Sequence, residues 1–159
     1  MTLRNNETVK RVEILLKQFD PNSEVIVLEN SARTALEAAK SLNCEVGAIV
    51  KSLLFKTEQN FILCLVAGDK KASLNKIKKI LNMKDVSMAS ADDVKNVTGF
   101  TIGGVSPIGH LNKIEILIDL SLERFDELFA AAGHPNCIFK ISFEDLSKIT
   151  NGSIRELVE

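Results

Sequence analysis

The sequence predicts an α+β fold, with a mixed, strongly curved β-sheet surrounded by helices in a single domain over residues 1–159. Helical and strand-like patterns are interspersed along the chain, which is long enough for one continuous core. Two β-rich apolar runs, at 46–55 and 60–68, are joined by the polar segment KTEQ, which indicates a hairpin. Because a hairpin breaks the regular alternation of a doubly wound parallel sheet, a mixed sheet is expected.

The N-terminal part is expected to hold two helices and a short strand. Apolar residues recur at spacings of three and four over about 5–19, which predicts an amphipathic helix that ends before a proline. The segment 23–29 is β-rich and predicts a strand. Thr34 and Glu37 form a capping box, which predicts a second helix over 34–42.

The C-terminal half continues with short elements of both kinds. Helices are expected over 73–82, capped by Ser73, and over 91–97. The run IEILIDL predicts a strand at 114–120, followed by a helix with Leu122, Phe125, Phe129 and Ala132 on one side. Gly133 suits the left-handed residue that ends this helix. A strand at 137–142 and a short helix at 142–150 complete the predicted order.

Composition indicates where the protein is located and whether it needs a cofactor. Hydrophobic residues make up 45% and charged residues 26%, as in a soluble globular protein. The chain has no apolar run long enough to span a bilayer, and its N-terminus is too polar for a secretory signal, so a cytoplasmic protein with no membrane contact is expected. Three distant cysteines and two histidines indicate neither disulfides nor a metal, and no cofactor is expected.

A run of lysines is the one strong local bias in charge. The net charge is −1, yet the segment from Lys70 to Lys79 contains five lysines and no acid. Such a run is typical of a solvated helix face, and it also suits the backbone of a nucleic acid. The sequence leaves both interpretations open.

Lys51 stands out as a candidate site residue. It lies in the middle of the apolar strand 46–55, where alternation places it on the face of Ile49, Leu53 and Phe55. An ammonium group there loses hydration unless it is paired or opens into a cleft. A lysine stem can also lie along apolar surface while its head reaches water, so a structural interpretation remains beside the functional one.

The segment GFTIGGVSPIGH, residues 99–110, concentrates four of the eight glycines of the chain. Glycines without side chains let a ligand approach backbone N–H groups closely, and such donors can hold an oxyanion or a sugar hydroxyl. The candidate stretch is Gly103, Gly104, Val105, Ser106 and Pro107. The alternative is a wide structural loop around a β-bulge.

Asp119 and His134 are weaker candidates. Asp119 ends the predicted strand at 114–120, where it can pair with a lysine or, as we favour, cap the helix that begins near Ser121. His134 is left unexplained by helix termination. No GxSxG, HExxH, Walker or GxGxxG motif occurs, so catalysis would depend on positioning and on backbone dipoles.

These features together resemble one family. The ordered segments TALEAAKSLNCEVGAIVKSLLF, LVAGDKKASLNKI, VTGFTIGGVSPIGH, IEILIDLSL and AAGHPNCIFKIS are similar to the YbaK/ProX family of aminoacyl-tRNA deacylases, freestanding relatives of the editing domain of bacterial prolyl-tRNA synthetases. The resemblance runs from about Ser23 to about Gly152. It implies hydrolysis of the ester that joins a wrong amino acid to the 3′-terminal adenosine of tRNA.

The resemblance also assigns roles to residues. Lys51 matches the family's substrate-site lysine, and Gly103 to Pro107 match its GxxxP loop, which implies that Lys51 and Gly103 act in catalysis and the rest of the loop in substrate binding. His134 matches a pocket-lining position, and Asp119 matches an acidic residue after a late strand. The expected partners are mischarged tRNA, with its 3′-terminal adenosine, and prolyl-tRNA synthetase.

The identity of the amino acid depends on departures from the family pattern. Ser52 stands where members specialised for alanine carry Asn, so this substrate-binding position argues against alanine alone. The segment AGHPN is more similar to relatives that accept 2-aminobutyrate, and the cysteine-removing branch stays open. The expected function is therefore removal of 2-aminobutyrate, alanine or cysteine from proline tRNA. The alternatives are a non-catalytic tRNA-binding or nucleotide-binding module and an esterase for another small acyl group.

Overall fold

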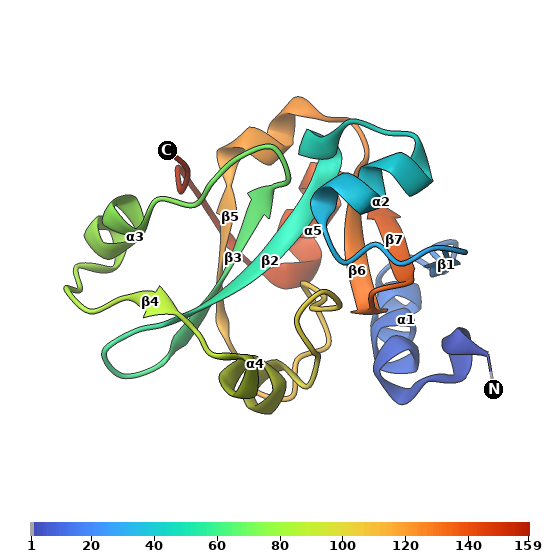
Figure 1. Cartoon of the computed structure of the whole chain (residues 1–159), viewed down its shortest axis with the longest axis horizontal. Coiled ribbons are helices and arrows are strands. Elements are labelled where there is room, and N and C mark those ends of the chain that lie inside the picture. Colours follow the sequence, from blue (N-terminus) through green and yellow to red (C-terminus); the bar gives the residue numbers. More distant parts are fainter. Residues whose placement is uncertain (1) are drawn as a thin grey trace.

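A computed structural model describes residues 2–159 and shows a mixed β-sheet with helices around it (Figure 1). The eight strands follow the order β1-β7-β6-β2-β3-β5-β8, and β4 pairs with β2 outside this path. This arrangement confirms the predicted fold class. The strands are β1 Ile26–Val27, β2 Ile49–Lys56, β3 Phe61–Ala67, β4 Ser87–Met88, β5 Glu115–Asp119, β6 Leu128–His134, β7 Cys137–Ile141 and β8 Ser153–Arg155.

Each α-helix begins at a polar side chain that accepts a hydrogen bond from a backbone N–H of the first turn, an interaction that contributes about 1 kcal/mol. The predicted caps Thr34 and Ser73 are confirmed, with acceptor distances of 3.1 and 3.2 Å. The helices are α1 Glu7–Phe19, α2 Ala35–Leu42, α3 Leu74–Leu81, α4 Ala91–Thr98 and α5 Phe143–Thr150, with 3-10 turns η1 Leu3–Asn5, η2 Val46–Ala48 and η3 Leu120–Arg124.

Strand β2 is the centre of the sheet. One edge pairs along its length with β3, which confirms the predicted hairpin. The other edge pairs with β6 at Ile49 and Val50 and with β4 at Phe55 and Lys56. Figure 1 shows β2 and β3 twisting across the molecule, with α3 at one end and α1 at the other.

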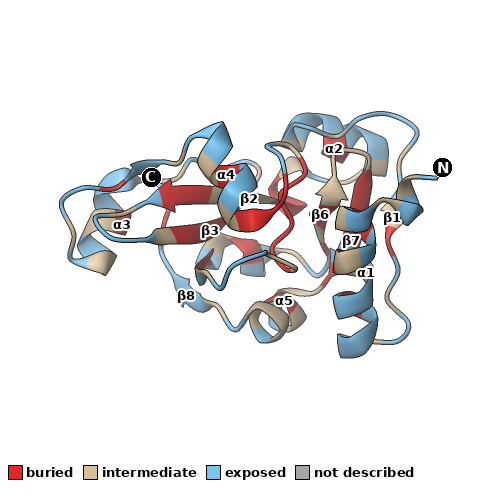
Figure 2. Cartoon of the chain, turned by 90° about the horizontal axis from the view of Figure 1, so that it is seen from below, coloured by how far each residue is buried: buried red, intermediate tan, exposed pale blue. Residues whose placement is uncertain are grey.

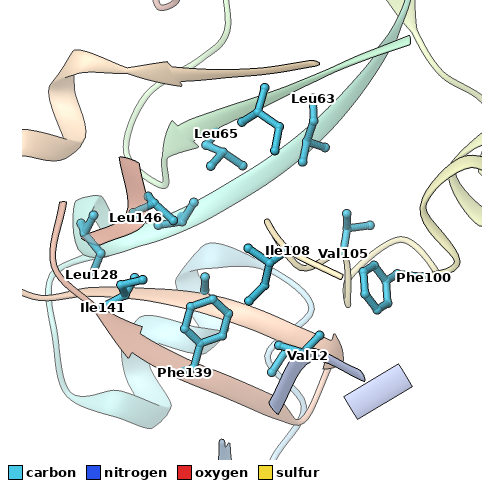
Figure 3. Packing of buried hydrophobic residues seen from close by; sticks show 14 of the residues in the cluster. Val12, Leu63, Leu65, Phe100, Val105, Ile108, Leu128, Phe139, Ile141 and Leu146 are labelled. Atoms are coloured by element: carbon cyan, nitrogen blue, oxygen red, sulfur yellow. The ribbon is translucent and has the colours of Figure 1, made fainter. Parts of the chain in front are cut away.

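The main core lies between β3, the β6–β7 hairpin, α1, α5 and the glycine-rich loop (Figure 3). Val105 and Ile108 of that loop point into the same apolar space as Phe100 and Val12. Figure 2 shows the consequence, with buried central strands and helices exposed on their outer faces. The glycine-rich loop is thus anchored in the core by its apolar side chains.

The predicted helix after Ser121 is wrong. The chain forms η3 and then enters β6, in which Leu128, Ala130 and Ala132 are buried while Phe129 and Ala131 are partly exposed. This burial has period two, but alanine on both faces hides the alternation in the sequence. Accordingly Gly133 does not end a helix, although its φ of +92° is left-handed. It lies at a register shift of the β6–β7 pair.

Three strands differ from expectation because they are very short. The strand expected at 23–29 is limited to Ile26 and Val27, and β4 and β8 were not predicted. Runs of two or three residues contain too little alternation to be recognised. The remaining predicted elements lie within three residues of the observed bounds.

Candidate active site

A cavity of about 340 Å³ lies along the unpaired part of β2. Because β6 and β4 pair only with the two ends of this edge, residues 51–54 have no strand partner there within the described chain. The Ala89 N–H donates to the Leu54 carbonyl at 3.0 Å. Backbone groups of alternate residues point to the same edge, so those of Ser52 also point toward this gap in the sheet.

The other walls come from elements far apart in the sequence. They are the segment before α2, the glycine-rich loop and the β6–β7 hairpin. The lining is mostly apolar, and no Asp or Glu among residues 2–159 contributes to it. The lining residues used below are Arg33, Lys51, Ser52, Gly103, Val105 and Cys137.

Lys51 lies in the cavity wall, half-buried, as its place in an apolar strand suggested. Its ammonium group donates to the Lys70 carbonyl at 2.5 Å, in the loop between β3 and α3. Burial lowers the pKa of Lys51, and the nearby Asp69 carboxylate opposes this change. The Lys70 carbonyl therefore orients the cation of a residue that lines the cavity.

Ser52 has the most unusual environment in the cavity. Its Oγ is buried and makes no hydrogen bond, the one such side-chain atom in residues 2–159. An unpaired buried hydroxyl costs about 1–3 kcal/mol. Ser52 also lines the cavity, so a polar ligand group that reached the hydroxyl would remove this penalty.

The glycine-rich loop divides between the cavity and the core. Gly103 lines the cavity, and its φ of +95° is one that other residues rarely adopt. Gly104 lies against β6, because an added Cβ would be 3.0 Å from backbone atoms of His134. The N–H of Gly104 donates to the Thr101 carbonyl, whereas those of Gly103 and Val105 are in none of the loop and turn backbone bonds of the described residues.

Ser106 and Pro107 lie away from the cavity. Ser106 is fully buried, and its Oγ accepts from the Ile108 N–H at 3.2 Å. Its carbonyl is 2.7 Å from His110 Nε2. Pro107 lines a separate depression beside α1. The cavity-facing part of the predicted GxxxP stretch is thus Gly103 and Val105, while Ser106 and Pro107 fold the loop.

The remaining candidates, Asp119 and His134, do not line the cavity. Asp119 is 1% exposed and caps η3, as predicted, by accepting from the Ser121 N–H; it also accepts from the Leu157 N–H at 2.7 Å. These bonds give it a structural role. His134 Nδ1 accepts from the Asn136 N–H, which shapes the β6–β7 turn beside the cavity.

Arg33 is a candidate that the sequence did not suggest. It lines the cavity opposite β2, and its stem lies beside Gly103. It takes part in none of the three ion pairs of residues 2–159. The only sequence signal is its position directly before the N-cap Thr34, a place shared by many surface arginines. With Lys51 it gives the cavity two cations, which favours an anionic ligand group.

The cavity contains no obvious nucleophile. Cys137 lines it, but burial raises the pKa of this thiol, so the reactive thiolate is disfavoured. Ser52 has no base beside it within the described lining. Among residues 2–159, no group of three His, Cys, Asp or Glu side chains could hold a metal ion, and no helix is long and apolar enough to cross a membrane. The polar groups that the described lining offers are the cations of Lys51 and Arg33, the hydroxyls of Ser52 and Thr34, and backbone groups.

Comparisons with known proteins identify the family of the chain. The aminoacyl-tRNA editing domain family matches residues 29–149. The chain is 32% identical to the uncharacterized protein YwhH of Bacillus subtilis (strain 168), over 90% of this chain and 91% of that protein. It is 31% identical to the proline–tRNA ligase of Thermosipho africanus (strain TCF52B), over 76% of this chain but only 19% of the ligase.

A solved structure gives the same result. A protein proposed as a trans-editing enzyme for prolyl tRNA synthetase has a TM-score of 0.91 and 34% identity, over 97% of this chain and 98% of that one. The family match covers the cavity walls from Arg33 to Ile138. The chain therefore belongs to the aminoacyl-tRNA editing domain family, and it is an aminoacyl-tRNA deacylase.

Proposed function

We propose that this deacylase releases a small wrong amino acid from proline tRNA in trans, with 2-aminobutyrate, alanine and cysteine as the candidate substrates. The observation that carries the proposal is the open edge of β2, where Lys51 and Ser52, whose hydroxyl is unpaired, line a mostly apolar cavity. The similarity to proline–tRNA ligases supports the choice of tRNA. We expect the reaction to take place in the cytoplasm, where tRNA is charged. We expect prolyl-tRNA synthetase to be a partner, because it produces the mischarged tRNA.

The size of the cavity supports a small acyl group. Its volume of about 340 Å³ is near the lower end of the usual range for ligand pockets, about 300–1,000 Å³. A synthetase gains only about 1–3 kcal/mol of selectivity for each missing methylene, so smaller amino acids are mischarged and a second pocket must remove them. An apolar cavity of limited volume suits this second selection.

The proposed mechanism uses the residues in the cavity wall. Lys51 and Arg33 hold phosphate at the 3′ end of the tRNA, and the N–H groups of Gly103 and Val105 face the ester carbonyl. A water attacks the carbonyl carbon, and the ester C–O bond breaks to release the amino acid. The proton of the water passes through the neighbouring ribose hydroxyl to the leaving ribose oxygen, which restores the 3′ adenosine. Backbone donors at a developing oxyanion contribute about 10²–10³ in rate, so an already reactive ester needs no triad.

The test is a deacylation panel with purified protein and proline tRNA that carries alanine, 2-aminobutyrate, cysteine, serine or proline. We expect release of at least one small amino acid well above the spontaneous rate, with proline retained. Lys51→Ala should lower kcat/KM about a hundredfold, because a charge in the cavity is lost. Lys56→Ala, at the exposed end of the same strand, is the matched control and should retain the activity.

Each alternative has its own result. Release no faster than the spontaneous rate for every tRNA would leave a binding module, and equal turnover of free aminoacyl esters would indicate a general esterase. Deacylation of a different tRNA in preference to proline tRNA would contradict the proposed substrate while retaining the deacylase.

A further inference from the structure

We propose that the Asp69–Arg124 ion pair is a positioning device for Lys51, which fixes the loop whose Lys70 carbonyl holds the Lys51 ammonium. The inference rests on the proposed role of Lys51 in the cavity. Neither Asp69 nor Arg124 lines that cavity. Their effect is exerted through the backbone that follows β3.

The ion pair is built more firmly than an ordinary surface pair. Arg124 Nη1 and Nη2 donate to the two Asp69 oxygens at 3.0 and 2.7 Å, a bidentate arrangement. Arg124 Nε donates to the Ser121 carbonyl at 2.6 Å, and its guanidinium lies 4.8 Å from the centre of the Phe125 ring. Four contacts therefore fix the Arg124 side chain. Bidentate geometry of this kind makes an ion pair stronger than an ordinary exposed pair.

The loop between β3 and α3 is held from both sides. Before Asp69, the Gly68 N–H donates to the Ile49 carbonyl at 2.8 Å, which ties the loop to the start of β2. On the other side Asp69 is held by Arg124 of η3. Directly after these two attachments, the Lys70 carbonyl accepts from Lys51. A shift of Asp69 would move this carbonyl and release the ammonium.

The packing around the pair leaves little room for other arrangements. A Cβ added at Gly47 would be 2.6 Å from the Phe125 ring and 3.0 Å from the Asp69 carboxyl carbon. The turn before β2, the loop after β3 and η3 therefore meet at one point. The absence of a side chain at Gly47 allows the three segments to approach one another, and the Asp69–Arg124 ion pair links two of them.

The charges that act on Lys51 can be separated. Asp69 is the near carboxylate and raises the pKa of Lys51, against the lowering by burial. Arg124 is bonded to that carboxylate and partly neutralises it, and Lys70 lies beside it. Arg33 lines the same cavity from the segment before α2. The opposite strand β3 presents the uncharged Val66 to Lys51.

The test compares Asp69→Asn, Arg124→Gln and Arg124→Lys. Loss of the bidentate geometry should lower kcat/KM for deacylation about ten- to a hundredfold in all three, because small displacements of a site group are costly. The pKa of Lys51 should fall in Asp69→Asn and rise in Arg124→Gln. It should stay close to wild type in Arg124→Lys, which keeps the charge but not the fork. NMR titration of the labelled lysine, assigned by its loss in Lys51→Arg, measures this directly.

Glu127→Gln removes the exposed Lys140–Glu127 pair of 2.9 Å and is the matched control, with no change in either readout. Unchanged kcat/KM in all three variants of an active enzyme would overturn the proposal. So would equal pKa values of Lys51 in Asp69→Asn and Arg124→Gln. If no substrate is turned over by the wild type, the proposed function fails, yet the NMR titration still tests whether the pair controls Lys51.

Discussion

At the scale of single residues, two neighbouring polar residues of β2, Lys51 and Ser52, distinguish the candidate site. The Ser52 hydroxyl is buried without a partner, beside the only part of β2 that lacks a strand neighbour on that edge in residues 2–159. The adjacent Lys51 is held by one backbone carbonyl and opens to the same cavity. The unpaired Ser52 hydroxyl lowers the stability of the protein, and a polar ligand group that reached it would satisfy it.

This cost gives a prediction for Ser52→Ala. Removing a buried hydroxyl that has no partner should leave the free energy of unfolding unchanged or raise it by about 1 kcal/mol. The same change should lower kcat/KM for deacylation about tenfold, because the substrate loses a hydrogen bond. Urea unfolding and deacylation kinetics measure the two effects.

The matched control is Ser106→Ala, because this buried hydroxyl does have a partner, the Ile108 N–H. It should lower the free energy of unfolding by about 1–3 kcal/mol. A clear loss of stability in Ser52→Ala would show that the hydroxyl is paired in solution and would contradict the assignment.

At the scale of elements, the glycine-rich loop has two jobs. Its apolar residues Val105 and Ile108 fill the core, while Gly103 lines the cavity. The loop is closed by His110, whose ring bonds the Ser106 carbonyl and packs edge-on against Phe100. The position of Gly103 in the cavity wall therefore depends on these contacts of His110.

The closure should make stability depend on pH. Burial lowers the pKa of His110, the Arg11 cation lowers it further, and the bond to Ser106 opposes both. Since the folded pKa is below the unfolded value of about 6.5, the unfolded chain takes up the proton first, and stability is lost as the pH falls from about 6.5 through the folded pKa.

His110→Gln should therefore lose less stability than wild type between pH 7.5 and pH 5, measured by urea unfolding at each pH. His134→Gln keeps the histidine of the loop, so its stability should still fall over this pH range. An identical loss in wild type and His110→Gln would exclude His110 as the source.

At the scale of the whole molecule, Figure 1 shows α3 at the end away from the β6–β7 hairpin, and this helix contains three of the lysines of the run. Lys78, Lys79 and Lys84 line one shallow depression there, together with Asn82 and Met83. Lys76 is different, because its ammonium donates to the Val158 carbonyl at 2.7 Å. If a tRNA that binds in the cavity also extends to this end, its phosphates would meet Lys78, Lys79 and Lys84.

The salt dependence of tRNA binding tests this surface. Lys79→Ala and Lys84→Ala should each weaken binding and flatten the plot of log K against log salt by about 0.7–0.9, the value for one lost phosphate contact. Lys140→Ala, on β7 at the other end, is the control and should leave the slope unchanged. Slopes equal to that of the wild type in all variants would show that these lysines form a solvated face and do not contact tRNA.

Parts of the fold and the site were predictable because they depend on local chemistry. Residues close together in the sequence determine the helix caps and the hairpin, so we could predict the caps Thr34 and Ser73 and the hairpin before Gly68. The helix expected after Ser121 was wrong, since the alanines of β6 carry no signal of which face is buried. Arg33 was missed because only the tertiary fold brings it to Gly103.

By itself the sequence determined the mixed α+β fold, the family and two central elements of the site, the strand of Lys51 and the loop of Gly103. These are fixed by patterns of neighbours and by the order of motifs. Only the tertiary structure decided which of the predicted residues line one cavity. It placed Ser106, Pro107 and Asp119 outside the cavity, added Arg33, and left the edge of β2 open between β6 and β4. The physical reason is that a cavity forms where strand pairing is missing, and missing pairs are a property of the assembled sheet.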